Sequence, residues 1–136
     1  MLRRFLVALF VAGALASPAL ADNDQIDADL EACLDNEMST QGMVECLGAA
    51  YEAWDSALNE VYGRLRGSLS AEEAAALRDA QRAWIAFRDA ESAFLASLMV
   101  PERGTIMRIT VNAMMTDLVK ARVLALRALT EGEGEQ

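Results

Sequence analysis

Apolar residues recur at three- and four-residue steps along most of the chain, which is the spacing of amphipathic helices. The predicted helices cover about residues 25–35, 40–66, 71–98 and 105–129. Ser39 or Thr40 is a candidate cap for the first long helix, and Ser70 with Glu73 has the spacing of a capping box before the next. The fold class predicted is therefore all-α, with three long helices packed as an antiparallel array through short loops.

The same spacing predicts which side chains face inward. In the first long helix they are Met43, Leu47, Ala50, Trp54, Leu58, Val61 and Leu65. In the second they are Leu77, Ala80, Trp84, Phe87, Phe94 and Leu98. In the third they are Ile106, Ile109, Ala113, Leu118, Leu126 and Leu129. Trp84 and Phe87 are expected to fill the core, with an exposed anchor for a partner as the alternative.

The first 21 residues have the layout of a secretory signal peptide. Arg3 and Arg4 precede an apolar run over 5–16, and a small-x-small site ends at Ala21. A membrane anchor is the alternative, but a span needs roughly 20 apolar residues. We therefore expect cleavage before Asp22, a periplasmic or secreted product and no membrane span.

Beyond the signal peptide we expect one helical domain over 22–130 and a flexible acidic tail over 131–136. The domain carries two cysteines, Cys33 and Cys46. An even count in an exported protein favours a disulfide, here one that staples the short first helix to the next. Two buried thiols are the alternative.

Charge and composition narrow the function. The chain has 12 Lys+Arg, 21 Asp+Glu and no His, so catalysis or metal binding through imidazole is excluded, and the acidity argues against nucleic acid. Eleven acids and no base lie within 22–60. This asymmetry indicates either a surface that attracts cationic partners or a solubilising face. A calcium loop at Asp22 is rejected because position six lacks Gly, and we expect no metal and no cofactor.

Three segments together resemble one known family. They are Cys33…Ser39-Thr40…Met43…Cys46, then Tyr51…Asp55…Asn59, then Gln81-Arg82-x-Trp84-x-x-Phe87-Arg88-Asp89. Over about residues 33–129 the chain is similar to the LprI-like family, named for a lipoprotein that inhibits lysozyme. Members usually carry a second cysteine pair, and here those positions are Ser92 and Met114.

The resemblance implies an exported helical binding protein, not an enzyme, that occludes the cleft of a cationic c-type lysozyme. The expected steering acids are Asp24, Asp27, Glu31 and Asp35, and the expected deep contacts are Ser39, Thr40 and Arg103. We expect a monomer or a weak dimer. The alternatives are an envelope structural or adaptor module and, more remotely, a cell-wall hydrolase that uses Asp55, Asp89 or Glu91.

The residues of the family motif are expected to be mainly structural. They are Tyr51, Asp55, Asn59, Gln81, Arg82, Trp84, Phe87, Arg88 and Asp89. For Arg88 we predict an ion pair or hydrogen bond to Asp55 or Asn59 on the preceding helix, which would fix the register of the two helices.

Overall fold

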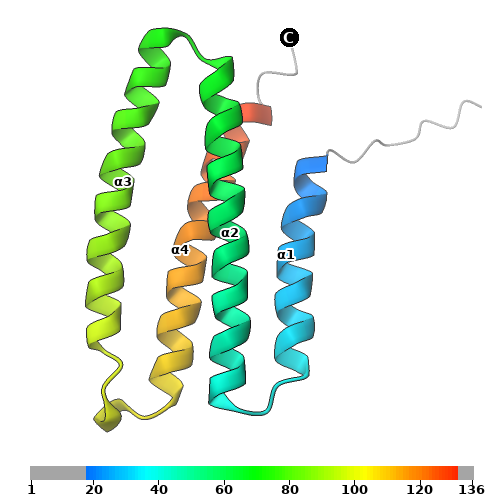
Figure 1. Cartoon of the computed structure of the whole chain (residues 1–136), viewed down its shortest axis with the longest axis vertical. Helices are drawn as coiled ribbons and strands as arrows, with labels where there is room; N and C mark the ends of the chain where they lie inside the picture. The colour runs from blue at the N-terminus through cyan, green and yellow to red at the C-terminus, as the bar shows by residue number, and fades with distance from the viewer. Residues whose placement is uncertain (1–17, 132–136) are drawn as a thin grey trace, which may run out of the picture.

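The computed structural model describes residues 18–131, with side chains from residue 25 to residue 130. The described chain is all-α, as predicted. Its elements are α1 (Pro18–Asp35), α2 (Thr40–Ser68), α3 (Ala71–Ser97), the 3-10 turn η1 (Pro101–Arg103) and α4 (Ile106–Glu131). Successive helices are antiparallel, and α2 lies between α1 and α3 with α4 behind it (Figure 1). The alternation makes α2 and α4 run in the same direction (Figure 1).

Helix α1 begins earlier than predicted, at Pro18 instead of about residue 25. Proline favours the first helical turn because its missing N–H would have no partner there, and the alanines and leucine that follow are strong helix formers. The expected cleavage point before Asp22 therefore lies within α1. Most of the predicted signal peptide, residues 1–17, and the tail over 132–136 lie outside the described residues.

Side-chain caps fix where the long helices begin. The Ser39 hydroxyl accepts from the amide of Gly42 at 3.0 Å, which caps α2. Ser70 and Glu73 form the predicted capping box at the start of α3: the Glu73 amide donates to the Ser70 hydroxyl, and the Glu73 carboxylate accepts from the Ser70 amide. Each bond satisfies a backbone donor that a helix start leaves without a partner.

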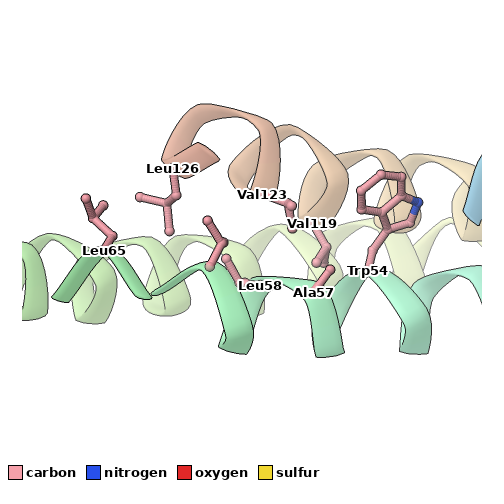
Figure 2. Close-up of a cluster of buried hydrophobic side chains, with 8 residues drawn as sticks. Trp54, Ala57, Leu58, Leu65, Val119, Val123 and Leu126 are labelled. Atoms are coloured by element: carbon pink, nitrogen blue, oxygen red, sulfur yellow. The ribbon is translucent and has the colours of Figure 1, made fainter. Parts of the chain in front are cut away.

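The core lies mainly between α2 and α4. Trp54 is fully buried, and Val119 and Val123 of α4 pack against the same cluster (Figure 2). The inward face predicted for α2 is confirmed from Leu47 to Leu65, while Met43 is half-buried. These side chains supply most of the apolar burial, at roughly 1.5–3 kcal/mol for each large one.

The inward face predicted for α3 is partly wrong. Phe87 and Phe94 are 53% and 57% exposed, and Ala80 is exposed as well. The inner face instead follows Leu77, Gln81, Trp84, Arg88, Glu91 and Leu95. Polar side chains on this face have partners on α2 and α4. Helix α3 is therefore rotated about its axis relative to the orientation that would bury its most apolar face.

The inward face predicted for α4 is also partly wrong. Ile106 and Leu129, at the two ends, are exposed, whereas Val111, Val119 and Val123 are fully buried. Helix α4 packs against α2 and α3 and reaches α1 through Lys120, so a wider arc of its surface is covered. Leu126, which was also predicted to face inward, is buried in the core with Val119 and Val123. Three further predicted residues, Ile109, Ala113 and Leu118, are half-buried.

No helix in the described part of the chain has the length and apolarity to cross a membrane.

Candidate functional site

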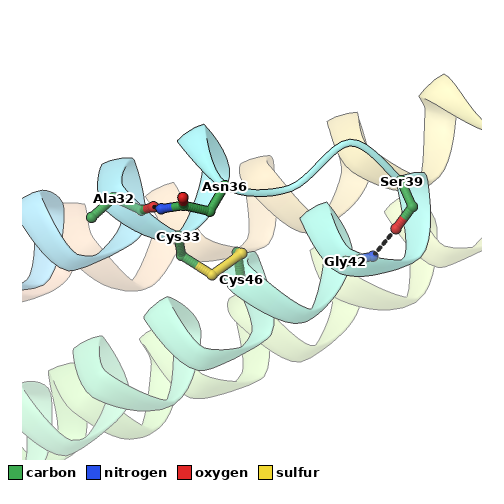
Figure 3. The surroundings of a disulfide bond; sticks show 6 residues. All are labelled: Ala32, Cys33, Asn36, Ser39, Gly42 and Cys46. Carbon is green, nitrogen blue, oxygen red and sulfur yellow. Dashed lines mark hydrogen bonds between the residues drawn. A yellow bond between two sulfur atoms is a disulfide. The ribbon is translucent and has the colours of Figure 1, made fainter.

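The predicted disulfide is confirmed, and it joins the last turn of α1 to the second turn of α2 (Figure 3). The Cα atoms of Cys33 and Cys46 are 5.8 Å apart, within the usual range for a bonded pair. Both cysteines of the chain are in this bond. The Asn36 side chain donates to the carbonyl of Ala32 and closes the end of α1 beside it (Figure 3).

An ion pair provides a second connection for α1. Nζ of Lys120 on α4 lies 2.7 Å from Oδ2 of Asp27, and the same ammonium is 5.5 Å from the centre of the Trp54 ring. Asp27 was expected to attract a partner protein. The structure shows that this carboxylate is already engaged within the fold.

The other acids of α1 form an open acidic surface. Asp29, Glu31 and Asp35 are exposed, and no cation of another helix pairs with them among residues 25–130. The side chain of Asp24 lies outside the described ones. Of the four predicted steering acids, Glu31 and Asp35 are therefore placed where a partner could meet them, and Asp29 is a third that the sequence analysis did not choose. We call Asp29, Glu31 and Asp35 the acidic surface of α1.

Five of the family-motif residues meet where α2, α3 and α4 approach one another: Asp55, Gln81, Trp84, Arg88 and Asp89. The predicted interhelical ion pair of Arg88 is present, with its guanidinium 3.7 Å from the Asp55 carboxylate. Arg88 also donates to Asp89 at 2.8 Å and lies 5.5 Å from the centre of the Trp84 ring. On the other side of this cluster, Arg122 of α4 packs 5.8 Å from the same ring.

Polar bonds and charge explain why this cluster tolerates partial burial. Nε of Arg122 donates at 3.0 Å to Oε1 of the buried Gln81, which gives this oxygen a hydrogen-bond partner. The hydrogen bond to Asp89 raises the pKa of Arg88, and burial lowers the pKa of Arg122. The cluster thus connects α3 to α2 through an ion pair and to α4 through a charge-assisted hydrogen bond, and both depend on the distance and direction between the helices.

This arrangement is that of an ion-pair network, not of an acid–base pair. Asp55 and Asp89 both face the Arg88 guanidinium, so each carboxylate is the partner of the same cation. Among the described residues no group of three acids or cysteines could hold a metal ion. The remaining motif positions vary in burial: Asn59 and Arg82 are exposed, and Tyr51 is half-buried against the core.

A second surface forms where two loops meet at one end of the bundle. The loop between α1 and α2 and the loop between α3 and α4 lie at the same end (Figure 1). Arg108, in the first turn of α4, donates to the Gln41 side chain in the first turn of α2 at 3.1 Å and ties them together. The residues predicted to contact the partner, Ser39, Thr40 and Arg103, therefore lie at the same end of the bundle. We call residues 36–41 and 98–108 the loop end.

The loop end carries exposed apolar side chains that the sequence analysis missed. Met38 is 95% exposed and Ile106 is 64% exposed, and Met99 and Val100 contribute smaller apolar areas. Arg103 is exposed in η1, whereas the Ser39 hydroxyl is used by the helix cap. In the sequence, the adjacent apolar residues Met99 and Val100 before Pro101 were the available sign of an exposed apolar surface. The same pair is equally typical of the end of a buried helix.

The fold and its sites define a class: a small all-α protein with one disulfide, an ion-pair cluster that fixes a peripheral helix, and an exposed loop end. The chain belongs to the LprI lysozyme inhibitor family, because the family model described as "Lysozyme inhibitor LprI" matches residues 31–126. No curated protein and no solved structure matches the chain. The family is one of inhibitors, not of enzymes, and it implies a lysozyme as protein partner and a location outside the cytoplasm.

Proposed function

We propose that this protein inhibits a cationic c-type lysozyme by placing the loop end in the catalytic cleft. The observation that carries the proposal is the loop end itself, where Met38, Ile106 and Arg103 are all exposed at one end of the bundle. Exposed apolar side chains in a cluster are typical of surfaces that bind another protein.

The chemistry of the cleft favours this end over the acidic surface of α1. Retaining glycosidases such as lysozyme act through two carboxyl groups, so an inhibitor gains nothing by bringing further carboxylates against them. At the loop end the exposed carboxylate of Glu102 is accompanied by two exposed cations, Arg103 and Arg108, whereas the acidic surface of α1 carries carboxylates alone. The neighbouring methionines adapt their shape to an irregular surface. The loop end is therefore the better candidate for the deep contact.

The acidic surface of α1 has a separate role in this proposal. Asp29, Glu31 and Asp35 would attract the cationic enzyme and accelerate the encounter, which electrostatic steering does without strengthening the final complex much. Asp35 lies in the last turn of α1, next to the loop end, so the attraction is directed toward it. Asp27 is left out because Lys120 neutralises it.

The test compares two charge reversals at opposite ends of the molecule. Arg103→Glu should weaken inhibition of a c-type lysozyme at least about tenfold, since it replaces an attraction to the cleft by a repulsion. Arg66→Glu is the matched control, because Arg66 is exposed in the last turn of α2, at the far end of the bundle. It should leave inhibition unchanged.

Three other outcomes would contradict the proposal. Equal effects of both variants would show that net charge matters and the loop end does not. No inhibition by the unmodified protein would favour the envelope adaptor. Release of reducing ends from peptidoglycan by the protein alone would favour the hydrolase.

A further inference from the structure

Helix α3 carries an apolar stripe that no other part of the described chain covers. Its members are Ala76, Ala80, Ala83, Phe87, Ala90 and Phe94, and all six are exposed. They recur at alternating steps of four and three residues, which is the spacing of a helix–helix seam. We call these six residues the Phe–Ala seam. It lies beside the inner face of α3, which follows the same steps one residue further along.

The seam is not needed to hold α3 in place. The inner face already meets α2 and α4 through Leu95 and through the bonds of Gln81 and Arg88. The seam therefore leaves two half-exposed phenylalanines in water without a partner in this chain, which is costly unless another surface covers them.

We propose that the Phe–Ala seam binds the same seam of a second copy in an antiparallel, two-fold symmetric dimer. A two-fold axis placed level with residue 85 brings Phe94 opposite Ala76 of the second copy and Phe87 opposite its Ala83. The remaining pair of facing residues is Ala90 and Ala80. Each phenylalanine thus faces an alanine, so large side chains fill the space that small ones leave.

A parallel dimer does not have this fit. Every seam residue would then face its own copy, so Phe87 would meet Phe87 and Ala83 would meet Ala83. Alanine layers need the two helix axes close together and phenylalanine layers hold them apart, so the two kinds of layer cannot be satisfied at once. The order of the six residues therefore selects the antiparallel arrangement.

The exposed area indicates how tight this dimer is. A fully enclosed phenylalanine buries about 150–250 Å², so Phe87 and Phe94, 53% and 57% exposed, each offer about 100 Å². With the alanines, two copies would bury roughly 1,000 Å², which is at the lower end for specific interfaces. We expect a reversible dimer that forms at roughly tens to hundreds of micromolar protein.

Sedimentation equilibrium over a range of concentrations tests the association. Phe87→Glu should raise the dissociation constant of the dimer by about tenfold or more, because each dimer loses two buried phenylalanines and gains two buried charges. Ile85→Glu is the matched control: Ile85 is also a partly exposed apolar residue of α3, but it lies outside the seam. It should leave the dissociation constant unchanged, and both variants should retain the circular dichroism of the unmodified protein.

Distances between spin labels test the arrangement. Labels on Ala76→Cys, with the native disulfide intact, should lie about 27 Å apart along the helix axes, because 18 residues separate positions 76 and 94 at 1.5 Å each. Separations near 10 Å would mean a parallel pair and overturn the proposed arrangement. A monomer at all concentrations up to 1 mM, or a dimer that Phe87→Glu leaves intact, would overturn the proposal. Loss of lysozyme binding in a monomeric protein with Phe87→Glu would assign the seam to lysozyme instead.

Discussion

The disulfide is the strongest single attachment of α1, and its removal gives a quantitative test. In the double variant Cys33→Ser, Cys46→Ser the bond is lost while the hydroxyls preserve size. The bonded residues are 13 positions apart. For a closed loop of this length the chain-entropy relation gives about 3 kcal/mol of stabilisation at 25 °C.

The structure indicates where this loss appears. Without the disulfide, α1 is held by the Asp27–Lys120 ion pair and by partial burial of Ile26 and Leu30 against α2. The buried residues of the core cluster all come from α2 and α4, and α1 adds to it only the partly buried Ile26. We therefore expect α1 to open locally, while the amides at the centre of α2 keep most of their protection against hydrogen exchange.

Hydrogen exchange followed by mass spectrometry or NMR measures this opening segment by segment. A change of 3 kcal/mol corresponds to about a hundredfold loss of protection in α1. Asp27→Asn in the intact-disulfide protein is the comparison, and it should cost much less because a partly exposed ion pair contributes about 1 kcal/mol or less. Unchanged protection of α1 in the double-serine variant would refute the reasoning and show that packing alone holds this helix.

Three further results are expected. Trp54→Ala should lower the free energy of unfolding by about 3–5 kcal/mol, as measured by urea titration, because the indole is fully buried in the core. A double-mutant cycle with Arg88→Ala and Asp55→Asn should give a coupling energy of about 0.5 kcal/mol, since the pair is partly exposed and screened. Hydrogen bonds from Ser70 lower the pKa of Glu73. The capping box therefore contributes its full stability to α3 at pH values above the ordinary carboxyl pKa, and this contribution is lost as the pH falls through the lowered pKa of Glu73. Carboxyl NMR titration should show the pKa of Glu73 rising in Ser70→Ala.

The starts of α2 and α3 and the inward face of α2 could be predicted because their signals are local. Ser39 and Ser70 mark helix starts through bonds within one turn, and the buried stripe around Trp54 runs from Gly42 to Leu65 within one long helix. The disulfide was accessible for the same reason, since its cysteines flank a single short loop.

The orientation of α3 could not be predicted from apolar spacing. Two stripes one residue apart have the same period, and the one with Phe87 and Phe94 is the more apolar. The other prevails because Gln81 and Arg88 find partners on helices far away in sequence. Pairing of this kind depends on tertiary structure, so no local pattern reports it. For the same reason Asp27 was wrongly predicted to be a free steering acid: its partner Lys120 lies 93 residues further along the chain.

The parallel pairing of α2 and α4 has a consequence for how the chain folds. The central contacts of the core, such as Trp54 with Val119, join segments separated by the whole of α3. Most apolar burial therefore has to wait until a loop of about 60 residues has closed, at an entropic cost of roughly 3–4 kcal/mol. A bundle that packs only neighbouring helices avoids this delay. Stopped-flow fluorescence of a Trp84→Phe variant, in which Trp54 is the remaining tryptophan, should accordingly show slower folding than is usual for a helical protein of this length, with the core pair assembled late and in a single step.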